Sequence, residues 1–453
     1  MRELTAEYAA TVCGGQMICG NKDAVFNSIC IDSREGVPGA LFVALIGENT
    51  DGHKYIDSAV KNGCTVVLSQ KEIKTDACVI LVDDTLKAFH KIAADYRASF
   101  GAKAVGITGS VGKTTTKEFI YAVLSGKYNT LKSQGNFNSE TGMPLTAFNL
   151  NESHEMAVFE MGMDAKGEIA ALTKIARPDI AVITNIGVMH IEHLGSKKNI
   201  LSAKLEIERG LKRSGIMVLN GDDEMLWGVR DKLKHKIVYY GIDNKEALYR
   251  AENIAFGSRL TTFDVVTPIG TVPARINTEG RHNVLNALAA IVVGLYSGIS
   301  LSDCVKYLLN FKTTGMRQNV YELNGVTIIE DCYNAGPDSM KAALDILNTK
   351  QKNRIAVLSD MLELGKQSPE FHREIGEKCA LCADKLIAYG ELSAEICSGA
   401  KDAGLSEVYY CKDSDDTALK LFETARPGDT VLFKGSHGMH VEKVIEKYKG
   451  MMK

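Results

Sequence analysis

The first residues whose types and spacing could do chemistry lie in one stretch, Val105-Gly-Ile-Thr-Gly-Ser-Val-Gly-Lys-Thr-Thr-Thr116. An apolar run from Ala104 to Ile107 predicts a buried strand, and Lys117 to Leu124 has helical spacing. Between them, Gly109 and Gly112 allow the backbone to turn tightly, so that free N–H groups face an anion at the start of a helix. The stretch is typical of a loop that binds phosphate groups.

The polar residues of this loop predict a nucleotide site. We expect Lys113 to reach the β- and γ-phosphates and the Thr114 hydroxyl to ligate Mg²⁺. The residues expected to contact the nucleotide here are Gly109, Ser110, Val111, Gly112, Lys113, Thr114 and Thr115. The strict pattern requires glycine at position 107, where this chain has Ile107, so an ordinary glycine-rich turn is the alternative interpretation.

Further polar side chains stand where predicted strands end. One strand ends on Glu160, and another is followed a few residues later by His190. Because ligands gather at the carboxyl ends of strands in parallel sheets, we expect Glu160, His190 and Thr114 to converge on one metal-phosphate site. Mg²⁺ prefers hard oxygen ligands, which a Glu and a Thr supply. The alternative for His190 or His193 is a packed histidine with no functional role.

Other candidates lie on predicted helices. Lys204 belongs to a helical stretch from Ser202 to Glu208, where its spacing indicates a solvated charge. His282 and Asn286 share one face of the helix that starts at Gly280. Such a pair could contact an adenine edge or simply cap the helix.

Strand-end polar residues recur near both ends of the chain. Ser33 and Arg34 follow a strand and suit an anionic or nucleotide ligand, because arginine binds phosphate oxygens in a forked geometry, although Asp-Ser-Arg is also a common turn. Polar segments also follow two later strands, from Asp331 to Met340 and from Lys434 to Gly438. Their recurrence favours a site between domains over unrelated loop chemistry.

The order of predicted elements indicates an α/β protein of three domains with mostly parallel sheets. Residues 1–100 form a small α/β unit, residues 101–315 a central P-loop unit that alternates strand and helix, and residues 316–453 a third, Rossmann-like unit. Within the central unit, the pattern of residues 247–276 predicts a small β insertion. A length of 453 residues is sufficient for three domains of ordinary size.

Composition excludes several classes of protein. Hydrophobic residues make up 45% and charged residues 24%, as in soluble globular proteins, and a net charge of −3 does not favour nucleic acid or an anionic membrane surface. The first residues lack the apolar core of a signal peptide, and the longest apolar segment is too short to span a bilayer. We therefore expect a cytoplasmic enzyme. As a separate expectation, which composition does not supply, we take the enzyme to be a monomer.

The eleven cysteines show no paired spacing typical of a disulfide framework. Cys30, Cys64 and Cys332 fall in predicted strands, where cysteine serves as a small buried apolar residue. Cys379 and Cys382 form one C-x-x-C pair, but in a predicted helix with no second pair nearby, so metal or redox use is not the favoured interpretation.

Almost end to end, the chain resembles the Mur ligases, ATP-dependent enzymes that form amide bonds in peptidoglycan precursors. The strings that carry the resemblance are Asp32-Ser-Arg34, Phe42-Val-Ala-Leu-Ile-Gly47, Asp51-Gly-His53, Gly106 to Thr116, Gly135-Asn-Phe-Asn138, Glu160-Met-Gly162, Gly280-Arg-His-Asn283, Tyr333-Asn-Ala335, Pro337-Asp-Ser-Met340, Asp360-Met-Leu-Glu-Leu-Gly365 and Lys434-Gly435. The Asp-Met-Leu-Glu-Leu-Gly and Pro-Asp-Ser-Met strings favour the member that adds D-alanyl-D-alanine. The Asp-Asn-Pro-Arg string usual in the diaminopimelate-adding relative is missing from the sequence.

Two positions depart from the family pattern. Gly336 stands where the family usually has Asn, and His437 stands where an Arg is usual. Both belong to the third unit, so they bear on the contacts with the amine substrate and the nucleotide and not on the reaction.

The resemblance implies ATP-dependent ligation of D-alanyl-D-alanine to the terminal carboxylate of UDP-N-acetylmuramoyl-tripeptide through an acyl phosphate. The product would be the pentapeptide precursor on which cell wall, cell shape and division depend. The first unit would bind the UDP-sugar, the central unit ATP and Mg²⁺, and the third unit the amine. Whether the third residue of the peptide is lysine or diaminopimelate stays open.

The resemblance also implies roles for individual residues. Thr114 and Glu160 would ligate one Mg²⁺, and His190 with a carbamylated Lys204 a second. The nucleotide residues outside the loop would be His282, Asn283 and Asn286 at adenine, with Arg317 and Asp331 on the γ-phosphate and ribose side. The substrate-binding residues would be Ser33, Arg34, Asn136, Asn138, Tyr333, Asn334, Lys434 and Ser436. The catalytic set would be Lys113, Glu160, His190 and Lys204.

Rival functions remain at this point. Another Mur-type ligase that adds a different amino acid would differ only in the third unit. A P-loop ATPase that drives motion or transport would turn over without an amine acceptor, and it usually has Asp where this chain has Glu160. A catalytically silent binding module would lack the set of Lys113, Glu160 and Lys204.

Overall fold

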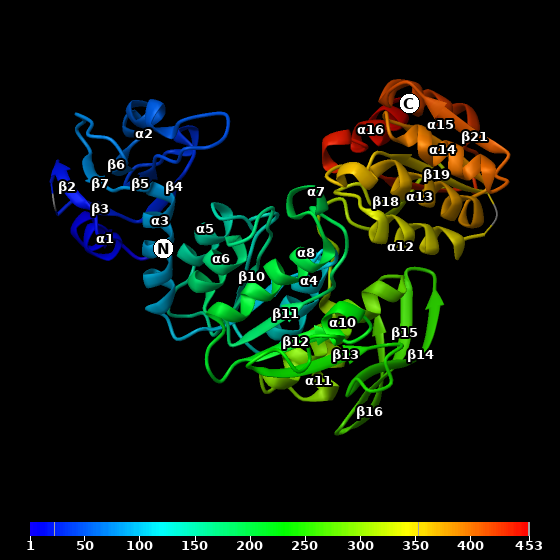
Figure 1. Cartoon of the computed structure of the whole chain (residues 1–453), viewed down its shortest axis with the longest axis horizontal. Coiled ribbons are helices and arrows are strands. Elements are labelled where there is room, and N and C mark those ends of the chain that lie inside the picture. The colour runs from blue at the N-terminus through cyan, green and yellow to red at the C-terminus, as the bar shows by residue number, and fades with distance from the viewer. Residues whose placement is uncertain (22, 352, 452–453) are drawn as a thin grey trace.

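The computed structural model describes residues 1–21, 23–351 and 353–451, which build three α/β units that follow one another along the chain (Figure 1). Each unit is built on its own main sheet, and the three sheets have five, nine and six strands. The predicted fold class, three α/β units with largely parallel sheets, is confirmed. No helix in the described part of the chain is both long and apolar enough to cross a membrane.

The first unit has a five-stranded sheet in the order β2-β7-β6-β5-β4, in which only the β2–β7 pair is antiparallel. These strands are β2 (Gln16–Cys19), β4 (Ser28–Cys30), β5 (Ala40–Val43), β6 (Cys64–Ser69) and β7 (Cys78–Leu81). A small antiparallel pair, β1 (Leu4–Thr5) with β3 (Val25–Phe26), lies beside it. The helices are α1 (Ala6–Cys13), α2 (Ile56–Lys61) and α3 (Thr85–Ala98), with 3-10 turns η1 (Ser33–Glu35) and η2 (Gly52–Tyr55).

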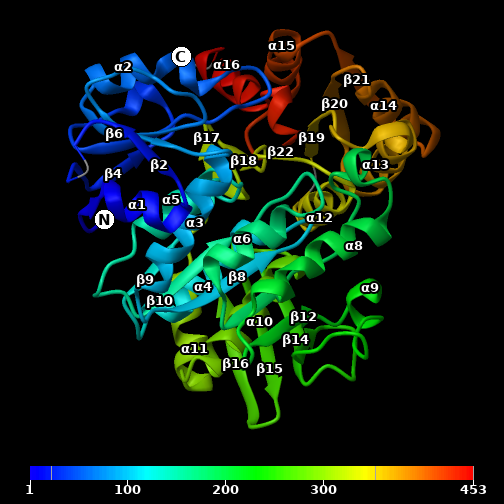
Figure 2. The same ribbon diagram turned by 60° about the vertical axis from the view of Figure 1, so that its left-hand side comes forward.

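The helix α3 joins the first unit to the central one. It packs against α5 (Gly142–Phe148) and α6 (Glu168–Ala176) of the central unit, as Figure 2 shows. The Phe89 ring stacks on Phe148, with centroids 5.9 Å apart, and the Tyr96 hydroxyl donates to Leu150 O at 3.0 Å. One continuous apolar core therefore spans both units.

The central unit has nine strands in the order β16-β15-β14-β13-β12-β11-β8-β10-β9, parallel from β9 through β14. They are β8 (Lys103–Thr108), β9 (Thr130–Lys132), β10 (Met156–Glu160), β11 (Ile180–Ile183), β12 (Ile216–Asn220), β13 (Lys236–Gly241), β14 (Tyr249–Gly257), β15 (Leu260–Thr267) and β16 (Gly270–Ile276). Its other helices are α4 (Lys113–Ser125), α7 (Ile191–Leu194), α8 (Lys197–Lys204), α9 (Glu224–Trp227), α10 (Arg281–Tyr296) and α11 (Leu301–Tyr307), with 3-10 turns η3 (Leu205–Gly210) and η4 (Leu308–Asn310). Strands such as β10 and β11 are buried along their whole length because helices cover both faces of a parallel sheet.

The third unit has six strands in the order β17-β18-β22-β19-β20-β21, of which only β17 is antiparallel to its neighbour. They are β17 (Asn319–Leu323), β18 (Val326–Glu330), β19 (Arg354–Ser359), β20 (Lys385–Tyr389), β21 (Glu407–Cys411) and β22 (Thr430–Lys434). Its helices are α12 (Pro337–Asn348), α13 (Ser368–Cys382), α14 (Ser393–Asp402), α15 (Ser414–Thr424) and α16 (Glu442–Met451), with 3-10 turns η5 (Gly365–Gln367) and η6 (His437–Met439).

Three local predictions were wrong in detail. The predicted strand that precedes Ser33 and Arg34 is not one strand, because it is divided at Asn27 into β3 and β4, which pair in different sheets. Residues 247–276 do not form a separate insertion, because β14 pairs with β13 and continues the central sheet into an antiparallel edge. Cys332 lies just beyond the end of β18, although it is buried as expected.

Candidate functional site

A cleft between the central and third units holds most of the predicted site residues. Those that line it are Ser110, Val111, Gly112, Lys113, Thr114, Thr115, Asn138, Glu160, His190, His282, Asn283, Asn286, Arg317, Asp331, Tyr333, Asn334 and Lys434. They come from the ends of strands in both sheets and from helix α10. Six predicted residues do not line the cleft: Ser33, Arg34, Gly109, Asn136, Lys204 and Ser436.

The glycine loop has the geometry of a phosphate cradle. Gly109 has φ of 150° and Gly112 has φ of 83°, in the left-handed range that side chains disfavour. A β-carbon at Gly109 would lie 1.9 Å from Thr184 Oγ1, so only glycine fits there. Helix α4 starts at Lys113 directly after the loop, and its N-terminus favours a bound anion.

Two residues not singled out from the sequence hold this loop in place. The Thr184 hydroxyl donates to Val111 O at 2.6 Å, and Val111 N donates to Asn185 Oδ1 at 2.9 Å. Both side chains follow β11, the strand next to β8 in the sheet. The signal that could have found them is their position at the carboxyl end of a strand, the same argument that selected Glu160.

The Lys113 ammonium lies over the loop. Its Nζ donates to Gly109 O at 2.8 Å and to Ser110 O at 3.3 Å. Burial lowers the pKa of Lys113, while the nearby Glu160 carboxylate opposes that change. An anion bound in the loop would offer this ammonium the oxygen atoms that the two carbonyls now supply.

The predicted Thr114–Glu160 pair is formed. Thr114 Oγ1 and Asn138 Nδ2 both donate to Glu160 Oε1, each at 2.9 Å. The other oxygen, Oε2, is buried and accepts no hydrogen bond among the described residues, although Lys117 Nζ lies 3.3 Å away. A buried carboxylate oxygen without a donor beside a threonine hydroxyl is a donor set that suits Mg²⁺.

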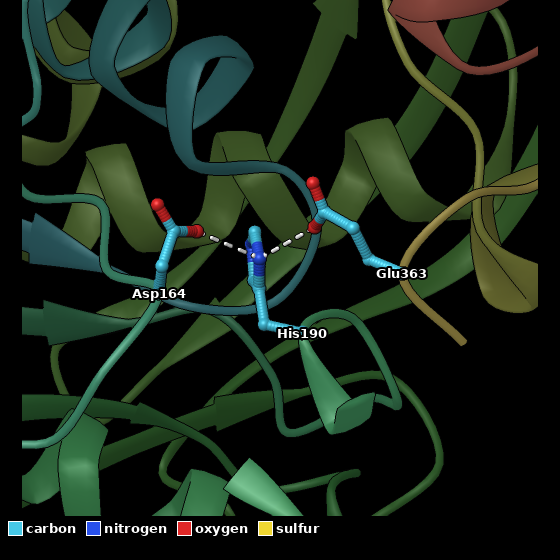
Figure 3. A group of neighbouring side chains, drawn as sticks. All are labelled: Asp164, His190 and Glu363. Carbon is cyan, nitrogen blue, oxygen red and sulfur yellow. Dashed lines mark ion pairs between the residues drawn. The ribbon is translucent and has the colours of Figure 1, made fainter. Parts of the chain in front are cut away.

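His190 lies between two carboxylates from different units. Its Nδ1 is 3.0 Å from Asp164 Oδ1 of the central unit and 2.8 Å from Glu363 Oε2 of the third unit (Figure 3). Burial disfavours the charged imidazole, but the neighbouring carboxylates of Asp164 and Glu363 outweigh it and raise the pKa of His190, although Nδ1 makes no aligned hydrogen bond among the described residues. The same contacts lower the pKa of both carboxyl groups. Neither Asp164 nor Glu363 was predicted, because they are far apart in the sequence.

Lys204 is not a solvated side chain. It is 1% exposed at the end of α8, and the described residues supply no hydrogen bond or ion pair to its ammonium. Burial, together with the charge of Lys113, lowers the pKa of Lys204 well below the usual value for lysine. The interpretation from spacing alone was therefore wrong, because a helix whose outer face looks polar in sequence is covered here by neighbouring elements.

The predicted adenine residues form a chain of hydrogen bonds. Thr116 Oγ1, on the phosphate-loop helix, donates to Asn286 Oδ1 at 2.9 Å, and Asn286 Nδ2 donates to Asn283 Oδ1 at 3.2 Å. Asn283 Nδ2 then donates to Gln318 Oε1 at 2.5 Å, at the entry to the third unit. Burial lowers the pKa of His282 to about 4, so its imidazole is neutral at neutral pH.

The third-unit residues form a second polar group across the cleft. The Arg317 guanidinium lies 3.6 Å from the centroid of the Tyr333 ring. Lys434 Nζ donates to Asp331 Oδ2 at 2.6 Å and to Asn334 O at 3.1 Å. The buried Ser436 hydroxyl accepts from Leu362 N at 2.9 Å behind this group.

Ser33 and Arg34 lie apart from the cleft in the first unit. Ser33 is buried and its carbonyl accepts from Asn62 Nδ2 at 2.8 Å, whereas Arg34 is exposed and pairs with Asp32. The structure therefore does not bring these two residues to the phosphate loop, and their predicted role depends on a ligand long enough to reach both places.

Models of one protein family match the chain in three segments. The Mur ligase family catalytic domain matches residues 25–97, the Mur ligase middle domain residues 107–294, and the glutamate ligase domain of Mur ligases residues 316–437. The matched segments together cover most of the chain and include the cleft.

Curated relatives match over nearly the full length. The UDP-N-acetylmuramoyl-tripeptide–D-alanyl-D-alanine ligase of Bacillus subtilis (strain 168) is 39% identical over 94% of this chain and 93% of its own length. The protein of the same name from Escherichia coli (strain K12) is 33% identical over 93% of this chain and 94% of its own length.

Solved structures with the same arrangement include crystal structure I of MurF from Acinetobacter baumannii, with a TM-score of 0.92 and 30% identity over 99% of both chains. The MurF ligase from Thermotoga maritima in complex with ADP has a TM-score of 0.85 and 29% identity, over 93% of this chain and 97% of that one.

Proposed function

Since the chain belongs to the Mur ligase family, we propose that it joins D-alanyl-D-alanine to the terminal carboxylate of UDP-N-acetylmuramoyl-tripeptide, converting ATP to ADP and phosphate. The chain is an ATP-dependent amide ligase of cell-wall precursor synthesis. The observation that carries the proposal is that Lys113, the Thr114–Glu160 pair and polar groups of the third unit line one cleft.

The chemistry requires activation of a carboxylate, because a carboxylate and an amine do not condense unaided in water. The peptide carboxylate attacks the γ-phosphorus of ATP, the bond to the β-phosphate oxygen breaks, and an acyl phosphate and ADP result. The free amine of D-alanyl-D-alanine then attacks the acyl carbon, loses a proton, and phosphate leaves from the tetrahedral intermediate. Phosphoryl transfer depends mainly on positioning and charge neutralisation.

The residues of the phosphate loop supply that positioning. Lys113 lies where it can exchange the carbonyl oxygens of Gly109 and Ser110 for oxygens of the β- and γ-phosphates. The N–H groups at the start of α4 hold the phosphates from the other side. Thr184 and Asn185 keep the loop in shape through Val111, so they act without touching the nucleotide.

The buried oxygen ligands support binding of Mg²⁺. Thr114 and Glu160 would hold one ion, and His190 with a carbamylated Lys204 a second. When bound, the ions neutralise charge on the phosphate groups. The depressed pKa of Lys204 supports carbamylation, because only the neutral amine reacts with CO₂.

The rest of the cleft divides between nucleotide and amine. His282, Asn283 and Asn286 would contact adenine, and Arg317 and Asp331 the γ-phosphate and ribose side. The amine substrate would bind near Tyr333, Asn334, Lys434 and Ser436. Residues that would contact the nucleotide belong to both units, so catalysis requires the third unit to lie against the central one.

The UDP-sugar would bind the first unit at Ser33 and Arg34, with the peptide running past Asn136 and Asn138 to the phosphate loop. This assignment supports a division of labour in which residues 1–100 bind the UDP-sugar, 101–315 ATP, and 316–453 the amine. We place the monomeric enzyme in the cytoplasm, where ATP and UDP-linked precursors are found.

Phosphate release tests the proposal. The protein with ATP, Mg²⁺ and UDP-N-acetylmuramoyl-tripeptide should release phosphate at a rate that rises strongly when D-alanyl-D-alanine is added. Release that depends instead on another amino acid would favour a different Mur-type ligase. Release independent of any amine would favour an ATPase. Tripeptides ending in lysine and in diaminopimelate, assayed in parallel, identify the accepted third residue.

A further inference from the structure

The segment Asp360-Met-Leu-Glu-Leu-Gly365 has no role in the function so far, yet buried side chains hold it firmly. Asp360 Oδ1 accepts from Ser393 N at 2.7 Å and from Ser393 Oγ at 2.6 Å. Two backbone N–H groups of the segment donate to buried side chains: Met361 N to His372 Nε2 at 2.9 Å and Leu362 N to Ser436 Oγ at 2.9 Å. The backbone that leads into Glu363 is therefore held in a fixed position.

This fixed segment presents Glu363 to the central unit. Glu363 Oε2 lies 2.8 Å from His190 Nδ1, and the backbone crosses the boundary too, because Glu192 N donates to Glu363 O at 3.4 Å. In Figure 3 Asp164 and Glu363 approach the His190 ring from opposite sides. Asp164 belongs to the same unit as His190, whereas Glu363 is carried by the third unit.

The geometry restricts what the histidine ring can do. A carboxylate held close to a ring nitrogen favours one orientation of the imidazole, because the two groups attract each other. Nδ1 lies within ion-pair distance of both carboxylates, but it makes no aligned hydrogen bond with either of them. One carboxylate leaves the ring free to rotate about that contact, and a second from the opposite side restricts it.

We propose that Glu363 is a positioning residue through which the third unit, when it lies against the central unit, sets the orientation of His190. This inference rests on the proposed function, in which His190 faces the metal and phosphate groups. Glu363 does not line the nucleotide cleft, so it acts on turnover through His190 and not through contact with ATP.

A merely stabilising ion pair is the rival explanation, and the two differ in what they predict. The Glu363 side chain is 44% exposed, and pairs of this kind contribute little to stability. The positioning role therefore predicts a loss of turnover without a loss of folding. Glu391, an exposed carboxylate of the same unit with no hydrogen bond or ion pair among the described residues, offers a matched control.

The experiment compares wild type, Glu363→Ala, Glu363→Gln and Glu391→Gln. Glu363→Ala should lower kcat about tenfold and leave the KM for ATP within about twofold. Glu363→Gln should recover part of that loss, because its amide group can still lie beside Nδ1 although the negative charge is lost. Glu391→Gln should match wild type. Melting temperatures should agree among all four proteins.

A spectroscopic measurement follows the ring itself. The proteins are labelled with ring-¹⁵N histidine and bound to a non-hydrolysable ATP analogue, and the His190 signals are identified by their loss in His190→Gln. Glu363→Ala should shift the His190 Nδ1 signal, whereas Glu391→Gln should not. An unchanged His190 signal, or a kcat equal to that of the control, would overturn the proposal.

These measurements separate the two hypotheses. If wild type releases no phosphate with any amine, the proposed function fails. The His190 signals would still report whether Glu363 sets the orientation of the His190 ring. If wild type is active but Glu363→Ala loses kcat without moving the His190 signal, Glu363 acts by another route and only the positioning role fails.

Discussion

Gly336 of the third unit lies directly against Met189 of the central unit: the β-carbon of any other residue at 336 would stand 2.2 Å from Met189 Sδ. The backbone there is extended, with φ of −160°, so the restriction is steric and not conformational. Gly187 is equally close to the third unit, since its β-carbon would lie 2.5 Å from Asp338 Oδ2. The two units meet so closely here that an added side chain at position 336 would have to displace the Met189 side chain.

This contact predicts the effect of restoring the usual family residue. Gly336→Asn should lower turnover several-fold, because overpacking at a tight contact typically costs about 1–3 kcal/mol and here opposes the approach of the two units. Met189→Ala should make room, so the double variant should recover most of the activity. Gly101→Asn, at a position with open space, is the control. Equal loss in the single and double variants would contradict the steric explanation.

The fold was predictable because its strands are short apolar runs, and these runs alternate with segments whose apolar residues have helical spacing. The phosphate loop, Glu160 and the third-unit groups could be found from strand ends, since a parallel sheet gathers those ends at one edge. The same argument selects Thr184 and Asn185 only when the strand order is known, because that order places β11 beside β8.

Contacts between units could not be predicted from the sequence. The meeting of Asp164 with Glu363 depends on how two separately folded units pack, which no local periodicity encodes. The burial of Lys204 was missed for a similar reason: its helix looks amphipathic and solvated in isolation, and only the surrounding elements cover it. The division at Asn27 likewise depends on pairing with other parts of the chain, because β3 pairs with β1 and β4 pairs with β5.

Lys113→Ala should abolish phosphoryl transfer while the fold survives. Removing a charge that stabilises the transferred phosphoryl group typically lowers kcat about 100-fold or more. Among the described residues, the side chain hydrogen-bonds to carbonyls of its own loop alone, so the melting temperature should change little. Phosphate release near the wild-type rate would contradict the assignment of the loop.

His282 should make the protein less stable in acid. Its pKa is about 4 in the folded protein and about 6.5 in an unfolded chain, so the unfolded state takes up the proton first as pH falls. Stability should therefore fall from pH 6.5 to about pH 4, by at most about 1.4 kcal/mol per pH unit from this group. Denaturation of wild type and His282→Gln at several pH values should show a smaller slope in the variant. Parallel slopes would contradict the lowered pKa of His282.

Nucleotide should stabilise the compact arrangement of the units. The two sides of the cleft are linked by the Asn283–Gln318 hydrogen bond and by an ion pair between Glu279 of the central unit and Lys350 of the third. Small-angle scattering should show a smaller radius of gyration with an ATP analogue and UDP-tripeptide than without ligands. Lys350→Ala should weaken that change. Identical scattering curves in both conditions would argue against closure.

Lys204→Ala should lose most activity if the buried amine carries a carbamate. The depressed pKa makes the neutral amine available to CO₂, and a carbamate supplies an oxygen ligand where the unmodified side chain has no partner among the described residues. Acetate or another short carboxylate should partly restore turnover in Lys204→Ala by filling the vacated oxygen position. Lys204→Glu should remain less active than the rescued protein, because its shorter side chain holds the oxygens too near the backbone.

Two measurements test whether Lys204 carries a carbamate. Steady-state rates of Lys204→Ala with and without acetate test the ligand role, and ¹³C-labelled bicarbonate should give a carbamate signal in wild type that the variant lacks. A solvated lysine would instead change stability by no more than about 0.5 kcal/mol on replacement and leave turnover intact. A fully active Lys204→Ala, or a wild-type protein without a carbamate signal, would end the carbamate hypothesis for this chain.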